Sequence, residues 1–154
     1  MRGRRLQADD WRPGFGGGRF RVIETTADLG VEAEGPTMGS AAASAVAGFY
    51  EVIAPAAPVR DERAAVVEAE APDEALAFAR AVQKLVALFD IERFVAAAAE
   101  VALEPGPPAR CRISMRGESF DPARHPYGVE VKAVTRHGLV FDRAARRVRL
   151  VLDI

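Results

Sequence analysis

The sequence predicts an α+β domain, a two-layer sandwich in which two main helices cover one face of a twisted sheet. Two segments place apolar residues at helical spacing, and several shorter segments show the patterns of strands. The part of the chain that follows the second helical segment is almost entirely strand-like. Helices and strands segregated along a chain in this way are typical of the α+β class.

The chain is long enough for one domain with a substantial core. It has 154 residues, of which 49% are hydrophobic, and nothing in its pattern divides it in two. Residues 1–18 differ, because they mix Arg, Asp, Pro and a triple glycine without hydrophobic periodicity. Such a segment buries too little apolar surface to offset its ordering entropy. We therefore expect a disordered leader over residues 1–18 and a folded domain over residues 19–154.

The first half of the domain predicts two strands followed by a helix. The segments "FRVIE" and "LGVEAEG" are strand-like and flank the turn-like "TTAD", which places Asp28 on a connection. Thr37 is a typical N-cap, and apolar residues from Met38 to Ile53 recur at helical spacing. We expect this helix to pack its apolar face on the sheet.

A second helix and a run of strands follow a Pro-rich linker. The segment "AAVVEAEA" is strand-like. Pro72, Asp73 and Glu74 mark a helix start, because proline tolerates the first turn and carboxylates favour its positive end. The helical spacing continues to about Asp90. The remaining strand-like segments are "FVAAAAEVAL", "RCRISMRG", "VEVKAVTRHGLVF" and "RRVRLVLDI".

The composition excludes several classes of protein. The 21 basic and 22 acidic residues nearly cancel, so we expect any RNA contact to be local or made through a partner. Cys111 is the single cysteine, which excludes an internal disulfide, and two histidines do not complete the usual structural zinc site. No segment has the apolar pattern of a signal peptide or a membrane span. We expect a cytoplasmic protein without a membrane partner.

The last strand ends in a pair of carboxylates. Side chains alternate along a strand, so we expect Ile154 to lie in the core with Leu152 and Asp153 to point outward. The Asp153 side chain then lies beside the terminal carboxylate, and two such charges about 4 Å apart repel by about 1 kcal/mol in water. A hard cation would reverse this repulsion, and oxygen ligands suit calcium, magnesium or manganese. The alternative is a solvated strand end without a ligand.

Lys132 and the loop before it form a second group of candidates. The segment "SFDPARHPYG" is a turn-rich loop that contains Asp121 and His125, and Lys132 lies between apolar residues in the strand that follows. Lys132 can act at a partner interface, or it can extend its amine into solvent or pair with Glu130. His125 and His137 are more typical of hydrogen-bonding residues in a loop and at a strand end than of metal ligands.

No motif of a free-standing enzyme is present. The chain lacks the GxSxG, HExxH and P-loop patterns. Gly16 to Gly18 lack the strand and helix context of a phosphate-binding loop. We therefore expect no catalytic residues.

Four segments together resemble the archease family: "ETTADLGVEAEGPT", "LFDIERF", "GESFDPARHPYGVEVKAVTRHGL" and the terminal "VLDI". The resemblance covers roughly residues 20–154, with the segments in the family's order. It implies an α+β fold of the SHS2 type. It also implies a protein cofactor of the RtcB-type RNA ligase, the GTP- and manganese-dependent enzyme of tRNA splicing and RNA repair. Archeases promote guanylylation of this ligase and allow multiple turnovers.

The resemblance implies a divalent cation site at the chain end. The ligands would be Asp28, Asp153 and the carboxylate of Ile154, with calcium as the expected cation and magnesium or manganese as alternatives. The chain departs from the family pattern at Thr25 and Arg136, where the family usually has histidine and tyrosine.

The resemblance also assigns residues to partner activation. Lys132 matches the lysine that is important for activation in the family, and we expect Glu118, His125 and His137 of the same motif to serve the partner as well. Two other functions compete with this one. The first is a chaperone or specificity factor for a tRNA-modifying enzyme such as a methyltransferase. The second is a small metal-dependent hydrolase, for which no positioned general base is evident.

Overall fold

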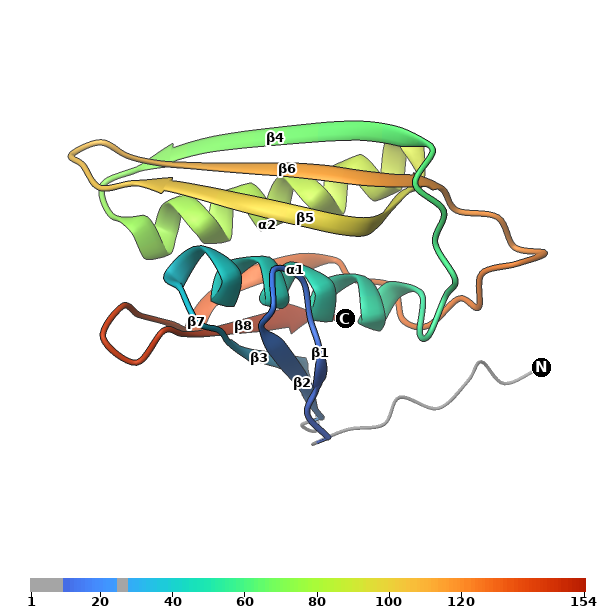
Figure 1. Cartoon of the computed structure of the whole chain (residues 1–154), viewed down its shortest axis with the longest axis horizontal. Helices are drawn as coiled ribbons and strands as arrows, with labels where there is room; N and C mark the ends of the chain where they lie inside the picture. The colour runs from blue at the N-terminus through green and yellow to red at the C-terminus, as the bar shows by residue number, and fades with distance from the viewer. Residues whose placement is uncertain (1–9, 25–27) are drawn as a thin grey trace.

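Two antiparallel sheets enclose a layer of two helices (Figure 1). The computed structural model describes residues 10–24 and 28–154. In chain order the elements are β1 (Arg12–Pro13), β2 (Arg19–Glu24), β3 (Asp28–Glu34), α1 (Met38–Ile53), β4 (Arg63–Ala71), α2 (Glu74–Glu92), β5 (Phe94–Glu104), β6 (Ala109–Ser119), β7 (Ala133–Asp142) and β8 (Arg147–Asp153).

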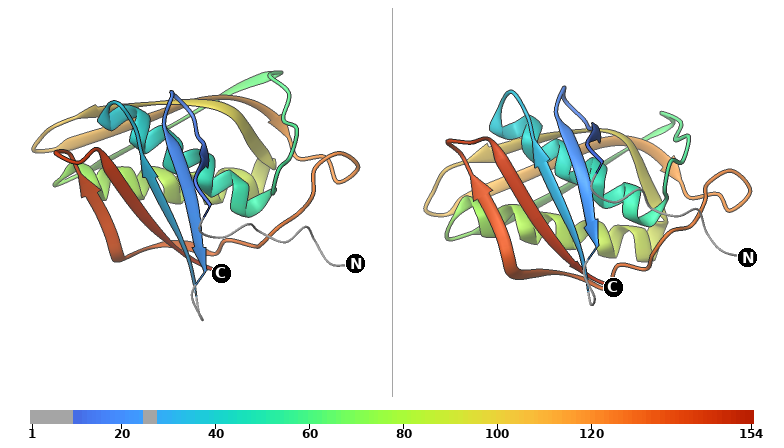
Figure 2. Two further views of the ribbon diagram at one scale, coloured as in Figure 1. Left: turned by 60° about the horizontal axis from the view of Figure 1, so that its bottom comes forward. Right: turned by 90° about the horizontal axis from the view of Figure 1, so that it is seen from below.

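The strands divide between a five-stranded sheet, in the order β1-β2-β3-β8-β7, and a three-stranded sheet, in the order β4-β6-β5. Each helix packs against both sheets, α1 mainly against β3 and β5 and α2 mainly against β4 and β7. The turned views of Figure 2 show the helices between the sheets. The predicted α+β sandwich with two main helices is confirmed. The strands form two sheets where the sequence suggested one, so each helix contacts a sheet on two sides.

Helix α1 is built to lie between two sheets. Thr37 forms a capping box with Ser40, since the Thr37 side chain accepts a hydrogen bond from the Ser40 N–H at 3.0 Å and the Ser40 hydroxyl accepts one from the Thr37 N–H at 2.9 Å. Every residue of the helix is buried except Gly39 and Glu51. Its many alanines and glycines let the sheets approach closely from both sides. The predicted helix bounds are confirmed.

Helix α2 begins where the carboxylates predict. Asp73 is its N-cap and accepts a hydrogen bond from the Leu76 N–H at 2.8 Å. Arg93, with a φ of 57°, ends the helix in the left-handed conformation. The helix buries one stripe of side chains, and the opposite side faces solvent. Within the described part of the chain, no helix is long and apolar enough to cross a membrane.

Residues 10–18 form an ordered arm, which differs from the disorder predicted for residues 1–18. Strand β1 pairs antiparallel with β2, and the arm continues across α1. There the Ser44 hydroxyl donates a hydrogen bond to the Phe15 carbonyl at 2.9 Å. This docking depends on long-range contacts that the local composition does not indicate. Residues 1–9 of the predicted leader lie outside the described residues.

Strand β8 is an interior strand of the five-stranded sheet, between β3 and the edge strand β7. Its alternate residues Val148, Leu150 and Leu152 are buried against the helices, as the alternation predicts. The expectation that Ile154 anchors in the core is wrong, because its side chain is 36% exposed. The strand ends at Asp153, and Ile154 lies beyond the last paired residues of its neighbours.

Candidate functional site

Two carboxylates meet at one end of the five-stranded sheet. Asp28 begins β3 and lies directly opposite Asp153 at the end of β8. The next pair, Leu29 and Leu152, is buried against the helices, so alternation places both aspartate side chains on the outer face of the sheet. Directly opposite residues of an antiparallel pair have Cβ atoms about 4.5–5.5 Å apart. The register therefore brings together two acidic side chains that are far apart in the sequence.

The donors at this strand end suit a hard divalent cation. Carboxylate oxygens are the ligands that calcium and magnesium prefer. Among residues 10–24 and 28–154, no group of three or more His, Cys, Asp or Glu side chains could hold a metal ion. The Asp28–Asp153 pair supplies two carboxylates, and Ile154 follows Asp153 in the sequence.

Lys132 lies at the same end of the sheet. Its N–H donates a hydrogen bond to the Asp153 carbonyl at 2.8 Å, and the following residue, Ala133, pairs with Asp153 in the β7–β8 ladder. The Lys132 side chain is exposed. It makes no ion pair with Glu130 or with any other residue that the structure describes. The backbone hydrogen bond fixes where this side chain leaves the sheet.

Glu118 and His125 form a buried polar cluster at the start of the loop that leads to Lys132. The Glu118 carboxylate accepts hydrogen bonds from the Arg60 N–H at 2.6 Å and from the guanidinium of Arg124. His125 Nε2 lies 3.1 Å from the same carboxylate, and His125 Nδ1 accepts a hydrogen bond from the Asp121 N–H at 2.8 Å. Because Nδ1 is an acceptor, the ring carries its proton on Nε2 and donates it to Glu118.

These contacts determine the charge state of the cluster. Burial alone would raise the pKa of the Glu118 carboxyl, but the hydrogen bonds from Arg60, Arg124 and His125 outweigh it and lower that pKa to about 2. The same carboxylate raises the pKa of Arg124. Glu118 is therefore an ionised carboxylate in the interior, stabilised by three donors.

The loop after β6 is also held by aromatic packing and by α1. Phe120 packs edge-on against Phe89 of α2, with ring centroids 5.8 Å apart, and Tyr127 stacks on Phe89 at 6.5 Å. The N–H groups of Gly128 and Val129 donate hydrogen bonds to carbonyls of the last turn of α1 at 2.7 and 3.0 Å. The path of the chain from Glu118 to Lys132 is thus fixed at several points.

The structure separates the predicted site residues into two groups and one outlier. The first group, at the sheet end, consists of Asp28, Asp153, Ile154 and Lys132. The second consists of Glu118 and His125, which are only 3% and 2% exposed and so cannot present a surface to a partner. The outlier is His137, which is exposed at the irregular part of β7.

Sequence reasoning missed the donors that stabilise Glu118. The Arg60 N–H comes from the linker between α1 and β4, and no local pattern identifies it. Arg124 stands directly before His125 in the loop, and its contact with Glu118 depends on how the loop folds. Thr25, where the family usually has histidine, lies outside the described residues. Arg136, where the family usually has tyrosine, is exposed on β7.

Comparisons with known proteins agree on one family. The model of the Archease protein family (MTH1598/TM1083) matches residues 20–154. The chain is 33% identical to protein archease of Aeropyrum pernix over 135 residues, which are 85% of this chain and 94% of that protein. It is 31% identical to protein archease of Archaeoglobus fulgidus over 77% of this chain and 85% of that protein. The solution structure of Methanobacterium thermoautotrophicum protein 1598 superposes with a TM-score of 0.71 at 22% identity, covering 88% of this chain and 98% of that one.

Proposed function

This chain belongs to the archease family, and from that premise we propose that it is a cytoplasmic protein cofactor that activates an RtcB-type RNA ligase in tRNA splicing or RNA repair. It promotes guanylylation of the ligase and multiple turnovers, and it has no catalytic activity of its own. RNA is reached only through the ligase. A net charge of −1 supports this last point, because no global positive field attracts RNA to the chain itself.

The observation that carries the proposal is the pairing of Asp28 with Asp153 beside Lys132. A divalent cation, calcium above all and otherwise magnesium or manganese, would be held by Asp28, Asp153 and the Ile154 carboxylate. When bound, it would supply positive charge that offsets the repulsion among three carboxylates. Lys132 leaves the same sheet end, where its ammonium can bind a phosphate or a carboxylate of the ligase.

The proposal is tested by the transfer of labelled GMP from GTP to the purified cognate ligase. This protein, added at substoichiometric amounts, should raise the rate at which the covalent guanylate adduct forms and the number of RNA joining events per ligase. Asp28→Asn and Asp153→Asn should each lower this activation. Asp61→Asn is the matched control, because Asp61 is exposed and pairs with Arg116 at 2.6 Å, away from the sheet end.

An unchanged adduct rate across calcium, magnesium and manganese would contradict the proposal. The same purified protein can then be added to a tRNA methyltransferase, where a change in the methylated position would support the specificity-factor function instead. Equal losses in Asp28→Asn and Asp61→Asn would show that the charge at the sheet end has no particular role.

A further inference from the structure

Side chains of α2 close the outer edges of two strands. Arg80 and Lys84 donate hydrogen bonds to main-chain carbonyls of β4, and Gln83 accepts one from the Val134 N–H of β7 at 2.8 Å. Strand edges present unpaired N–H and C=O groups that readily bind another strand, and proteins commonly block them. The helix thus protects one edge of each sheet.

The outer edge of β5 is not closed in this way. Strand β5 has 11 residues and forms the other edge of the three-stranded sheet. No hydrogen bond from any residue within 10–24 and 28–154 reaches this edge. Helix α1 packs beneath β5, and at its first turn a Cβ on Gly39 would lie 3.0 Å from the Val101 carbonyl oxygen. Most of the strand therefore keeps main-chain groups that a further strand could pair with.

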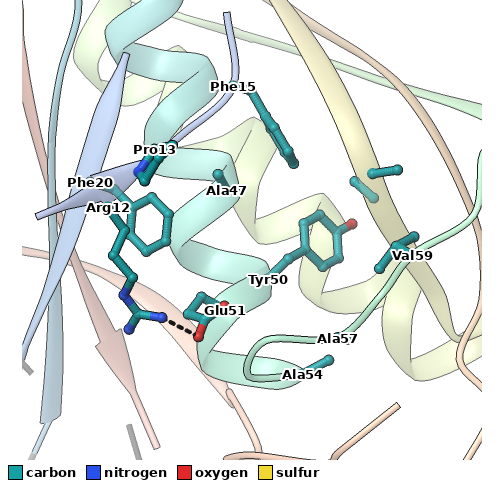
Figure 3. Close-up of a pocket in the computed structure, with 12 residues that line it drawn as sticks. Arg12, Pro13, Phe15, Phe20, Ala47, Tyr50, Glu51, Ala54, Ala57 and Val59 are labelled. Atoms are coloured by element: carbon teal, nitrogen blue, oxygen red, sulfur yellow. Dashed lines mark hydrogen bonds and ion pairs between the residues drawn. The ribbon is translucent and has the colours of Figure 1, made fainter. Parts of the chain in front are cut away.

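Two hollows lie along this open edge, between β5 and the N-terminal arm. The larger, of about 530 Å³, has aromatic walls from Phe15, Phe20 and Tyr50 and is bordered by Ala96 and Ala97 of β5. Figure 3 shows α1 as its floor, with the arm on one side and β5 on the other. The smaller, of about 360 Å³, lies further along β5, next to Ala99 and the first turns of α1. Small side chains of β5 and α1 leave this space unfilled.

The charge on β5 indicates what kind of strand fits. Glu100 and Glu104 point to the outer face of the sheet and are exposed, and neither makes an ion pair with a residue that the structure describes. A second copy of β5 would bring its own Glu100 and Glu104 beside these carboxylates, and like charges on adjacent strands repel. A strand with basic residues at alternate positions would instead match them.

We propose that the outer edge of β5 accepts an extended segment of a partner protein as an added strand. Alternate apolar side chains of that segment enter the two hollows, and the basic side chains between them lie opposite Glu100 and Glu104. Main-chain hydrogen bonds supply affinity, and the hollows and carboxylates supply specificity, as in other cases of strand addition. This docking surface is independent of the ligase and of the cation at the sheet end.

The probe is a short peptide in which lysine alternates with valine, compared with a peptide of the same composition in which the lysines and valines form separate blocks. Binding is measured by fluorescence anisotropy, and the position by hydrogen exchange of the backbone amides. The alternating peptide should bind about tenfold more tightly than the block peptide. Its binding should slow exchange along β5 and leave β4 and β7 unchanged.

Two substitutions at the proposed docking surface, each paired with a control substitution elsewhere, test which residues contact the peptide. Ala57→Trp fills the larger hollow, and Ala87→Trp adds the same side chain to the exposed side of α2. Glu100→Lys reverses a charge on β5, and Glu70→Lys does so on β4, at the opposite edge. The changes at Ala57 and Glu100 should each weaken peptide binding about tenfold, and the two controls should not.

Three results would overturn the proposal: equal binding of the two peptides, no protection of β5 amides, or equal effects of the paired substitutions. Concentration-dependent dimers in which β5 amides become protected would also overturn it, because the occupant would then be a second copy. The comparison of the two peptides uses the unaltered protein, so it decides the matter even if a substituted chain fails to fold.

Discussion

Glu118 is the residue on which the loop before Lys132 depends. It is a buried carboxylate with hydrogen bonds from the Arg60 N–H, Arg124 and His125. Removing one partner of such a cluster leaves a buried polar group unsatisfied, which destabilises a protein more than losing an exposed ion pair does. The conformation of the loop, and with it the position of Lys132, therefore depends on this buried cluster.

The Glu118 carboxylate predicts a loss of stability in acid. Its pKa is lowered to about 2 in the folded protein, from an ordinary value of 4.5. The unfolded chain thus takes up this proton first, so the stabilisation is complete above pH 4.5 and is lost as the pH falls toward 2. Urea unfolding from pH 2 to pH 7 measures this dependence. Glu118→Gln should lower the free energy of unfolding by about 3 kcal/mol at neutral pH and flatten the dependence between pH 4.5 and pH 2.

Glu62→Gln is the control for this measurement, because the Glu62 side chain is 58% exposed in its ion pair with Arg60. It should change stability little. A Glu118→Gln curve parallel to that of the unaltered protein would show that Glu118 does not carry the acid sensitivity.

Lys132→Ala should reduce ligase activation without loss of the fold. The side chain is exposed, and its main-chain hydrogen bond to Asp153 survives the substitution. A hydrogen bond to a charged group contributes about 1.5–3 kcal/mol, so activation should fall about tenfold or more. Guanylylation rates and thermal unfolding are measured on the same samples. Lys84→Ala, at an exposed lysine of α2, should keep full activation. A large fall in Tm with unchanged activation would make Lys132 a structural residue.

At the scale of elements, the pairing of β3 with β8 creates the candidate site. The two strands align from Asp28 opposite Asp153 to Glu34 opposite Arg147, without a register shift. A slip of one residue would turn every side chain of β8 to the other face of the sheet, and Asp153 would no longer lie beside Asp28. The buried residues Val148, Leu150 and Leu152 oppose such a slip, because it would expose them. Core packing therefore holds the two carboxylates together.

A residue appended after Ile154 should weaken cation binding while the fold survives. The extension converts the Ile154 carboxylate into a neutral peptide carbonyl and moves the new terminal charge about 3.5 Å further along the chain. Titration calorimetry with calcium measures the affinity of the extended and unextended forms. The same extension at the N-terminus is the control. Asp28→Asn combined with the extension should add little to the loss, because the ligands act as one unit. If the C-terminally and N-terminally extended forms bind calcium with equal affinity, the Ile154 carboxylate is not a ligand.

The elements themselves could largely be predicted from the sequence, and their pairing could not. Thr37 and the helical spacing after it define α1, and Asp73 defines the start of α2, because capping and periodicity are local properties. The separation of the strands into two sheets depends on long-range pairing, which local patterns do not encode. The proximity of Asp28 and Asp153 was expected only through the family resemblance. The burial of Glu118 and His125 was not expected from either source.

At the scale of the whole molecule, the N-terminal arm completes the cover of α1. Trp11 lies against the guanidinium groups of Arg19 and Arg21, whose carbons are 4.3 and 4.7 Å from the ring centroid. The same arginines pair with glutamates of β3. This packing connects the arm to the five-stranded sheet, so the arm belongs to the folded unit.

Deleting residues 1–18 should therefore destabilise the protein, although a disordered leader would be dispensable. The deletion removes β1 and the contact between Phe15 and Ser44, and it exposes apolar side chains that include Phe20. Exposing one large apolar side chain costs about 1.5–3 kcal/mol, and we expect a loss of about 2 kcal/mol in the free energy of unfolding. Urea unfolding of the shortened and full-length chains measures it. Identical curves would mean that the arm contributes nothing to stability.

The place of β8 between β3 and β7 has a consequence for biosynthesis. A ribosome makes β8 after the seven other strands that the structure describes, so β3 keeps an unpaired edge, and the apolar side of α1 that faces β8 stays uncovered, until residues 147–153 have emerged. The three-stranded sheet and α2 are complete before that point, because β4, β5 and β6 pair only with one another. The nascent chain thus passes through a half-built state in which the strand carrying Asp28 can bind other strands. Pairing of β8 with β3 ends this exposure and, in the same step, brings the two carboxylates together, so the candidate site forms only after β8 has joined the sheet.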